Sequence, residues 1–122
     1  MNAPVNFSVV ERDEDGVRVI VVAGELDIAT APSLCALLDA TRAGRRPRLL
    51  VDLTKVEFCD STGLRALLGA ASEVRNHGGS FALVCPPESD VARLLDVVGA
   101  GEAIAIYADH RAGLTALAPV GN

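Results

Sequence analysis

Two hydrophobic periodicities alternate along this 122-residue chain, and that alternation constrains the fold more than any other feature. Short runs of β-branched and other apolar residues, typical of buried strands, are followed by segments with apolar residues every three or four positions, as on one helix face. Strands alternating with helices predict a mainly parallel sheet joined by right-handed crossovers. The length fits one domain, since domains cluster at roughly 100–150 residues. We therefore expect a single α/β domain.

Five strands and about four helices can be placed along the chain by these patterns. The expected strands are Phe7–Val10, Val17–Ala23, Leu49–Leu53, Phe81–Cys85 and Ala103–Ile106. The expected helices carry apolar stripes that begin at Leu34, Leu64, Val91 and Leu114. Pro32 suits the first turn of the first helix, and Gly44 is placed to end it. Ser89 or Asp90 can cap the third helix and Asp109 the fourth.

The charged segment from Glu11 to Gly16 separates the first two strands and predicts a hairpin. The first strand should then be antiparallel to the second, and the others parallel. The result is a mixed, mostly parallel five-stranded sheet in the order strand-strand-helix-strand-helix-strand-helix-strand-helix. We place the domain at residues 5–117, with flexible termini at residues 1–4 and 118–122.

The charge of the chain, −5, argues against polyanionic partners, so we expect no nucleic acid and no membrane partner. The basic segment Arg42–Arg48 is the local exception, and we interpret it as a solvated turn. No apolar run reaches the ~18 residues of a membrane span, and Met1–Pro4 shows no signal-peptide pattern. These features predict a cytoplasmic protein.

The cysteines predict neither a metal site nor a disulfide framework. Cys35, Cys59 and Cys85 are more than twenty residues apart and form no CxxC pair. A zinc site needs closer ligand spacing. A sparse, odd set of cysteines fits a reducing compartment. We expect no metal and no cofactor.

One segment, Val56–Leu64, combines features suited to a functional site. It joins a buried strand to an amphipathic helix, and Asp60, Ser61 or Thr62 could each cap that helix. Capping alone would explain these residues. Gly63 is unusual there, because glycine costs about 0.5–1 kcal/mol relative to alanine within a helix. A hydroxyl at a helix N-terminus is also a favourable place for a phosphate, which would meet the helix dipole and free N–H groups.

The sequence Asp60-Ser61-Thr62-Gly63-Leu64 resembles the phosphorylation motif of STAS domains of the anti-sigma factor antagonist type. The segment Gly24-Glu25-Leu26-Asp27, followed by Ala31, resembles the second recurring segment of that family. The resemblance extends from about residue 6 to residue 117. The order of elements expected above is also the family's order.

The resemblance implies a partner-switching protein rather than an enzyme, with no catalytic residue of its own. Its unphosphorylated form would bind an anti-sigma factor that is also a serine kinase of the GHKL type, and so release a sigma factor. Phosphorylation of Ser61, with Thr62 as a second possible acceptor, would end binding, and a PPM-type phosphatase would reset the protein. The resemblance places Asp27, Asp60, Thr62, Gly63 and Glu25 at the partner-binding surface. Nothing in the pattern demands more than a monomer.

Three alternatives remain open. Some STAS domains are cytoplasmic subunits of lipid-transport ABC systems, and others are stressosome-like scaffolds; neither needs a phosphorylation cycle. A two-component receiver would use Asp52 as acceptor, but the chain's one lysine, Lys55, is badly placed to assist it.

Cys59 beside the motif could sense oxidants if its thiol were activated. His77 and His110 are expected to be exposed near helix ends.

Overall fold

The structure is a computed structural model that describes residues 7–41 and 46–119. Across these residues the strands form one five-stranded sheet in the order β1-β2-β3-β4-β5, antiparallel between β1 and β2 and parallel elsewhere. The predicted α/β class and mixed sheet are confirmed. The elements are β1 (Phe7–Glu14), β2 (Val17–Leu26), α1 (Ala31–Thr41), β3 (Arg48–Cys59), α2 (Ser61–Asn76), β4 (Ser80–Val84), α3 (Asp90–Val97), a 3-10 turn (Ala100–Glu102), β5 (Ala105–Tyr107) and α4 (His110–Leu117).

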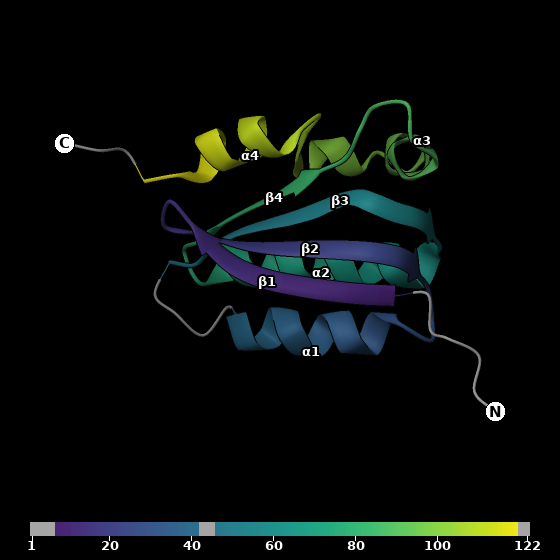
Figure 1. Ribbon diagram of the computed structural model, residues 1–122, viewed down its shortest axis with the longest axis horizontal. Coiled ribbons are helices and arrows are strands. Elements are labelled where there is room, and N and C mark those ends of the chain that lie inside the picture. The colour runs from purple at the N-terminus through teal and green to yellow at the C-terminus, as the bar shows by residue number, and fades with distance from the viewer. Residues whose placement is uncertain (1–6, 42–45, 120–122) are drawn as a thin grey trace.

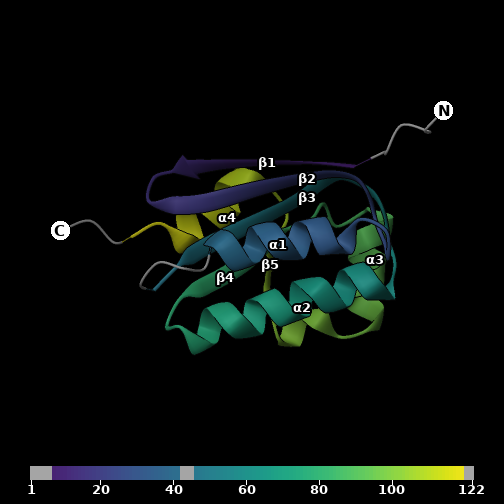
Figure 2. The same cartoon turned by 90° about the horizontal axis from the view of Figure 1, so that it is seen from below.

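Helices cover both faces of the sheet (Figure 1). Helices α1 and α2 lie side by side on one face (Figure 2), and α4 lies on the other. Successive strand residues point to opposite faces. Ile20 and Val51 accordingly belong to the larger core cluster, which includes the apolar stripes of α1 and α2. Their neighbours Val19 and Leu50 belong to a smaller cluster with Leu114 of α4.

The hairpin turn is shorter than the charged segment of the sequence indicated. The expected turn began at Glu11, but β1 continues to Glu14 and the turn is Asp15–Gly16 alone. Both turn residues have positive φ, 54° and 80°, as a two-residue type I′ hairpin requires. The charged residues of β1 are therefore strand residues. Arg18 on β2 pairs with two of them, Glu11 at 2.9 Å and Asp13 at 2.8 Å.

Strand β3 is longer than expected and continues past Leu53 to Cys59. Its first half pairs with β2 and β4, whereas its second half pairs with β2 alone, from Ala23 opposite Lys55 to Leu26 opposite Cys59. The exposed polar residues Thr54, Lys55 and Glu57 interrupt the apolar pattern that marks a buried strand. Pairing with the extended end of β2 thus places in a strand a segment that periodicity alone does not identify.

The final strand is also shifted relative to the expected range. Residues from Ala100 to Glu102 form a 3-10 turn after Gly99, and β5 begins only at Ala105. The expected caps Ser89 and Asp109 are confirmed, since their side chains accept hydrogen bonds from the first turns of α3 and α4. Among the described residues, no helix has both the length and the apolar character needed to cross a membrane.

Several predictions concern the chain ends and the loop after α1. Gly44, most of the basic segment, residues 1–4 and residues 120–122 lie outside the described residues. Pro32 lies in the first turn of α1, as expected. At the other end of the chain, Ala118 packs against the smaller core cluster, and the Pro119 ring lies close to Gly16 in the hairpin turn.

Candidate functional site

Ser61 is the first residue of α2, and the preceding Asp60 caps that helix. One carboxylate oxygen of Asp60 accepts hydrogen bonds from the backbone N–H groups of Thr62, at 2.9 Å, and Gly63, at 3.0 Å. The Ser61 side chain is exposed, and its hydroxyl makes no hydrogen bond with the part of the chain that the structure describes. Of the three residues that could cap this helix, Asp60 does so. Ser61 is left with a free hydroxyl at the helix N-terminus.

Gly63 lets the start of α2 contact the end of β2. A Cβ at Gly63 would lie 2.6 Å from Cγ of Leu26 and 2.7 Å from its carbonyl oxygen, closer than real Cβ atoms approach their neighbours. The same carbonyl accepts a hydrogen bond from the Asp60 N–H at 3.1 Å. The absence of a side chain at Gly63 thus allows a close contact with β2, which accounts for a residue that is otherwise unfavourable within a helix.

The loop that follows β2 is ordered by its own polar side chains. The Asp27 carboxylate accepts hydrogen bonds from the N–H groups of Ala29, at 2.9 Å, and Thr30, at 3.1 Å. The buried Thr30 hydroxyl donates to the Glu25 carbonyl at 2.8 Å and accepts from the Asp27 N–H at 2.9 Å. Asp27 thereby helps to fix the turn from β2 into α1. Because Leu26 is paired with Cys59, the two motifs of the sequence analysis meet at this edge.

Two apolar side chains are exposed in the segments that meet here, and the sequence analysis did not single them out. Ile28, in the loop after β2, is 74% exposed, and Phe58, near the end of β3, is 51% exposed. Phe58 lies opposite the exposed Glu25 in the pairing of β3 with β2. Neither stands out in the sequence, because apolar residues lie close on both sides: Leu26 and Ala29 near Ile28, and Val56 and Cys59 near Phe58. We call this region the Ser61 surface; it comprises Glu25, Asp27, Ile28, Glu57, Phe58, Asp60, Ser61 and Thr62.

Cys59 lies next to this surface, but its thiol is not activated. Burial, followed by the charge of Asp60 and the neighbouring Cys85, raises the pKa of the Cys59 thiol to about 11. Its sulfur lies 3.5 Å from the Asp60 carbonyl oxygen, which it contacts as a weak donor. An oxidant-sensing cysteine needs a lowered pKa, so this geometry argues against that role.

The two histidines differ from one another. His77 is exposed, as expected, and its Nδ1 lies 2.8 Å from the Glu73 carbonyl oxygen. His110 lies at a helix end, as expected, but it is only partly exposed, at 30%, and its ring contacts two carboxylates. Its partners, Glu14 and Asp52, are distant in sequence, which is why local context did not reveal them.

The geometry of Asp52 is also unfavourable for the receiver hypothesis. Its side chain is buried, and its two oxygens contact the Thr54 N–H and the His110 ring. The carboxylate is therefore not presented to a phosphate donor.

Within the described residues, no cluster of histidine, cysteine and carboxylate side chains is suited to hold a metal ion.

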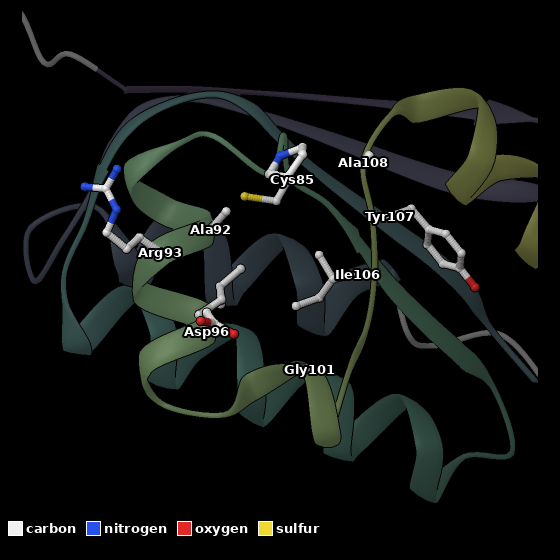
Figure 3. A pocket seen from close by; sticks show the side chains of 10 residues that line it. Cys85, Ala92, Arg93, Asp96, Gly101, Ile106, Tyr107 and Ala108 are labelled. Carbon is white, nitrogen blue, oxygen red and sulfur yellow. The ribbon is translucent and has the colours of Figure 1, made fainter.

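A cavity of about 470 Å³ lies between α3 and β5, apart from the Ser61 surface. Figure 3 shows the Cys85 sulfur and the Ile106 side chain directed into it, whereas Arg93 and Tyr107 point away. None of the predicted site residues lines this cavity.

Comparisons with known proteins agree on one family. The family model described as the STAS domain matches residues 8–113. The chain is 36% identical over 84 residues to the anti-sigma-F factor antagonist RsfB of Mycobacterium tuberculosis, covering 69% of this chain and 68% of that protein. It is 31% identical over 102 residues to an anti-sigma-B factor antagonist of Listeria monocytogenes, covering 84% and 88%. The crystal structure of an anti-sigma factor antagonist from Mycobacterium paratuberculosis matches with a TM-score of 0.84 and 32% identity, covering 96% and 98%.

Proposed function

The chain belongs to the STAS domain family, and from this premise we propose that it is an anti-sigma factor antagonist controlled by phosphorylation of Ser61. In this proposal the unphosphorylated form binds an anti-sigma factor of the GHKL serine-kinase type, and phosphorylation ends that binding. Relatives named as anti-sigma factor antagonists support the general role. The observation that carries the switch is the exposed Ser61 hydroxyl, left free because Asp60 caps the helix.

The Ser61 surface has the chemistry of a docking site sensitive to added charge. Ile28 and Phe58 offer apolar area that a partner would remove from water. A phosphate on Ser61 would add about −1.5 to −2 charges beside the Asp60 carboxylate. Burying an unpaired charge at an interface typically costs several kcal/mol. Phosphorylation should therefore weaken the complex even though the helix dipole favours the phosphate in the free protein.

The kinase supplies the catalytic groups in this proposal, so the chain itself needs none. In phosphoryl transfer by a kinase, the base and Mg²⁺ belong to the enzyme and the substrate presents a hydroxyl. Ser61 is more accessible than the half-buried Thr62, so we assign Ser61 as the acceptor and Thr62 as secondary. We further propose that a PPM-type phosphatase regenerates the binding form and that the protein acts as a monomer in the cytoplasm.

The test is a pull-down from host lysate with Ser61→Ala and Ser61→Asp baits, read by mass spectrometry. The Ala bait should capture a GHKL-type kinase, and the Asp bait should not, because the added charge opposes docking. The matched control is Ser72→Asp, which adds the same charge at an exposed serine further along α2. This control should still capture the kinase. Calorimetry with the purified kinase then measures the difference in affinity.

The competing hypothesis is a STAS subunit of a lipid-transport ABC system or of a stressosome-like scaffold, with no phosphorylation cycle. Both Ser61 baits would then capture the same transporter or scaffold proteins. That outcome would reduce Ser61 to an ordinary residue at the start of a helix and overturn the proposed switch.

A further inference from the structure

Away from the Ser61 surface, three titratable side chains from three elements meet. Glu14 is the last residue of β1, Asp52 lies on β3, and His110 is the first residue of α4. Nδ1 of His110 lies 3.1 Å from Oδ2 of Asp52, and Nε2 lies 3.2 Å from Oε1 of Glu14. Each nitrogen of the ring therefore faces its own carboxylate.

Both contacts are hydrogen bonds only when both ring nitrogens of His110 carry a proton, that is, when the imidazole is positively charged. Ionised carboxylates accept hydrogen bonds and donate none. A protonated imidazole donates from both nitrogens, whereas a neutral one donates from one and presents a lone pair at the other. Loss of the proton thus leaves one ring nitrogen facing an acceptor and removes the positive charge between two negative groups. The buried Asp52 keeps the hydrogen bond from the Thr54 N–H at 2.9 Å.

Three other charged residues lie near the cluster, and one of them, Arg12, contacts it directly through Glu14. Arg12 donates to the second oxygen of Glu14 at 2.6 Å, and Asp109 accepts from the Ala112 N–H at 2.8 Å. Arg111, the next residue of α4, is exposed. From β4 and β5, the side chains that pack with α4 in the smaller core cluster are Ala82, Val84 and Tyr107.

These surroundings favour the charged ring. Burial by itself would lower the pKa of His110, but the hydrogen bonds to Asp52 and Glu14, together with both negative charges, raise the pKa above its ordinary value of 6.5. The pKa of Glu14 is lowered, first by the hydrogen bond from Arg12, against the effect of burial, and further by His110.

We propose that Glu14, Asp52 and His110 form a proton-dependent clamp that holds α4 on the sheet. The clamp is closed when His110 is protonated, and it weakens when the proton leaves. Helix α4 covers the sheet face opposite α1 and α2 (Figure 1), where Gly113 lies against Leu50 and Val84. The clamp sits at the N-terminal end of this short helix, so its opening would loosen the cover over that apolar face.

The direction of the pH dependence follows from the raised pKa in the folded state. The clamp contributes its full stabilisation below the unfolded-state pKa, about 6.5. That stabilisation is lost as the pH rises through the folded-state pKa, which lies above 6.5. Helix α4 should therefore be held more firmly on the sheet at pH 6 than at pH 8.

Two measurements on the full chain test the clamp. The first follows the imidazole resonances of both histidines by NMR from pH 5 to pH 9. His110 should titrate above 6.5, and Glu14→Gln should lower its midpoint. The second measures hydrogen exchange of the α4 amides at pH 6 and pH 8, corrected for the intrinsic pH dependence of exchange. Their protection should fall at the higher pH.

The variants separate the clamp from a general effect of pH. His110→Gln cannot titrate, so protection of α4 should become equally low at both pH values. The control His77→Gln removes an exposed histidine outside the cluster and should retain the wild-type difference. A His110 midpoint at or below 6.5, or an unchanged pH difference in His110→Gln, would overturn the proposal. If His110→Gln fails to fold, the wild-type midpoint and its shift in Glu14→Gln still decide it.

Discussion

Asp60 and Ser61 are adjacent residues with separate tasks. The Asp60 carboxylate satisfies two N–H groups at the start of α2, a contribution of typically ~1 kcal/mol to stability. The Ser61 hydroxyl makes no contribution to this capping. Substitutions at Ser61 therefore test the proposed switch with little effect on folding, whereas substitutions at Asp60 would also remove the helix cap. This separation makes the Ser61→Ala and Ser61→Asp comparison interpretable.

At the same scale, Cys59 should react slowly with thiol reagents. With a pKa of about 11, roughly one molecule in a thousand carries the thiolate at pH 8. Alkylation by iodoacetamide, followed by peptide mass spectrometry, should be much slower at Cys59 than for free cysteine and should accelerate as the pH rises toward 11. Rapid modification at neutral pH would contradict the raised pKa and revive the oxidant-sensing hypothesis.

At the scale of elements, the contact between α2 and β2 joins the two motifs. Parallel pairing of β2 with β3 brings Leu26 beside Cys59, and the missing side chain at Gly63 lets α2 start directly against Leu26. The loop carrying Asp27 and Ile28 is thereby held next to Ser61. The geometry of the Ser61 surface thus depends on how α2 packs against the end of β2.

This contact predicts opposite effects for two glycines of the same helix. Gly63→Ala should destabilise the protein by ~1–3 kcal/mol, because its Cβ would overlap Leu26, including the carbonyl oxygen. Gly69→Ala, where a Cβ meets nothing within 4 Å, should instead stabilise by ~0.5–1 kcal/mol through helix propensity. Urea denaturation of both variants checks the pair. Equal effects would show that α2 does not rest on β2 as described.

At the scale of the whole molecule, the proposed docking surface and the proposed clamp lie in different regions of the sheet. The Ser61 surface lies where β2 and β3 end, whereas the His110 clamp joins the hairpin end of β1 to α4. The two can be tested independently. A failure of one proposal would leave the other standing.

The Ser61 surface should bind its partner through Ile28 and Phe58. Replacing both by serine should weaken binding of the anti-sigma factor at least tenfold, which corresponds to about 1.4 kcal/mol. Stability should change little, because both side chains are exposed. The control is Val97→Ser on α3, an apolar side chain about as exposed as Ile28, which should leave binding unchanged. Calorimetry measures the affinity, and full binding by the double variant would place the interface elsewhere.

The amino-acid sequence alone determined the local features of this protein. Periodicity placed the strands and helices, and short-range chemistry placed the caps Ser89 and Asp109, because the groups involved lie within a few residues of one another. The resemblance identified the motif around Ser61. The type of each strand and α-helix, and the segment proposed as the functional site, were therefore predictable.

Tertiary structure decided the features that depend on distant partners. The polar second half of β3 is a strand because β2 extends to pair with it. His110 meets carboxylates 58 and 96 residues away, and no local pattern encodes such contacts. The exposure of Phe58 follows from which strands flank it, not from its own hydrophobicity. Sequence periodicity reports how a residue relates to its near neighbours, whereas these outcomes depend on which strands and helices the fold places side by side.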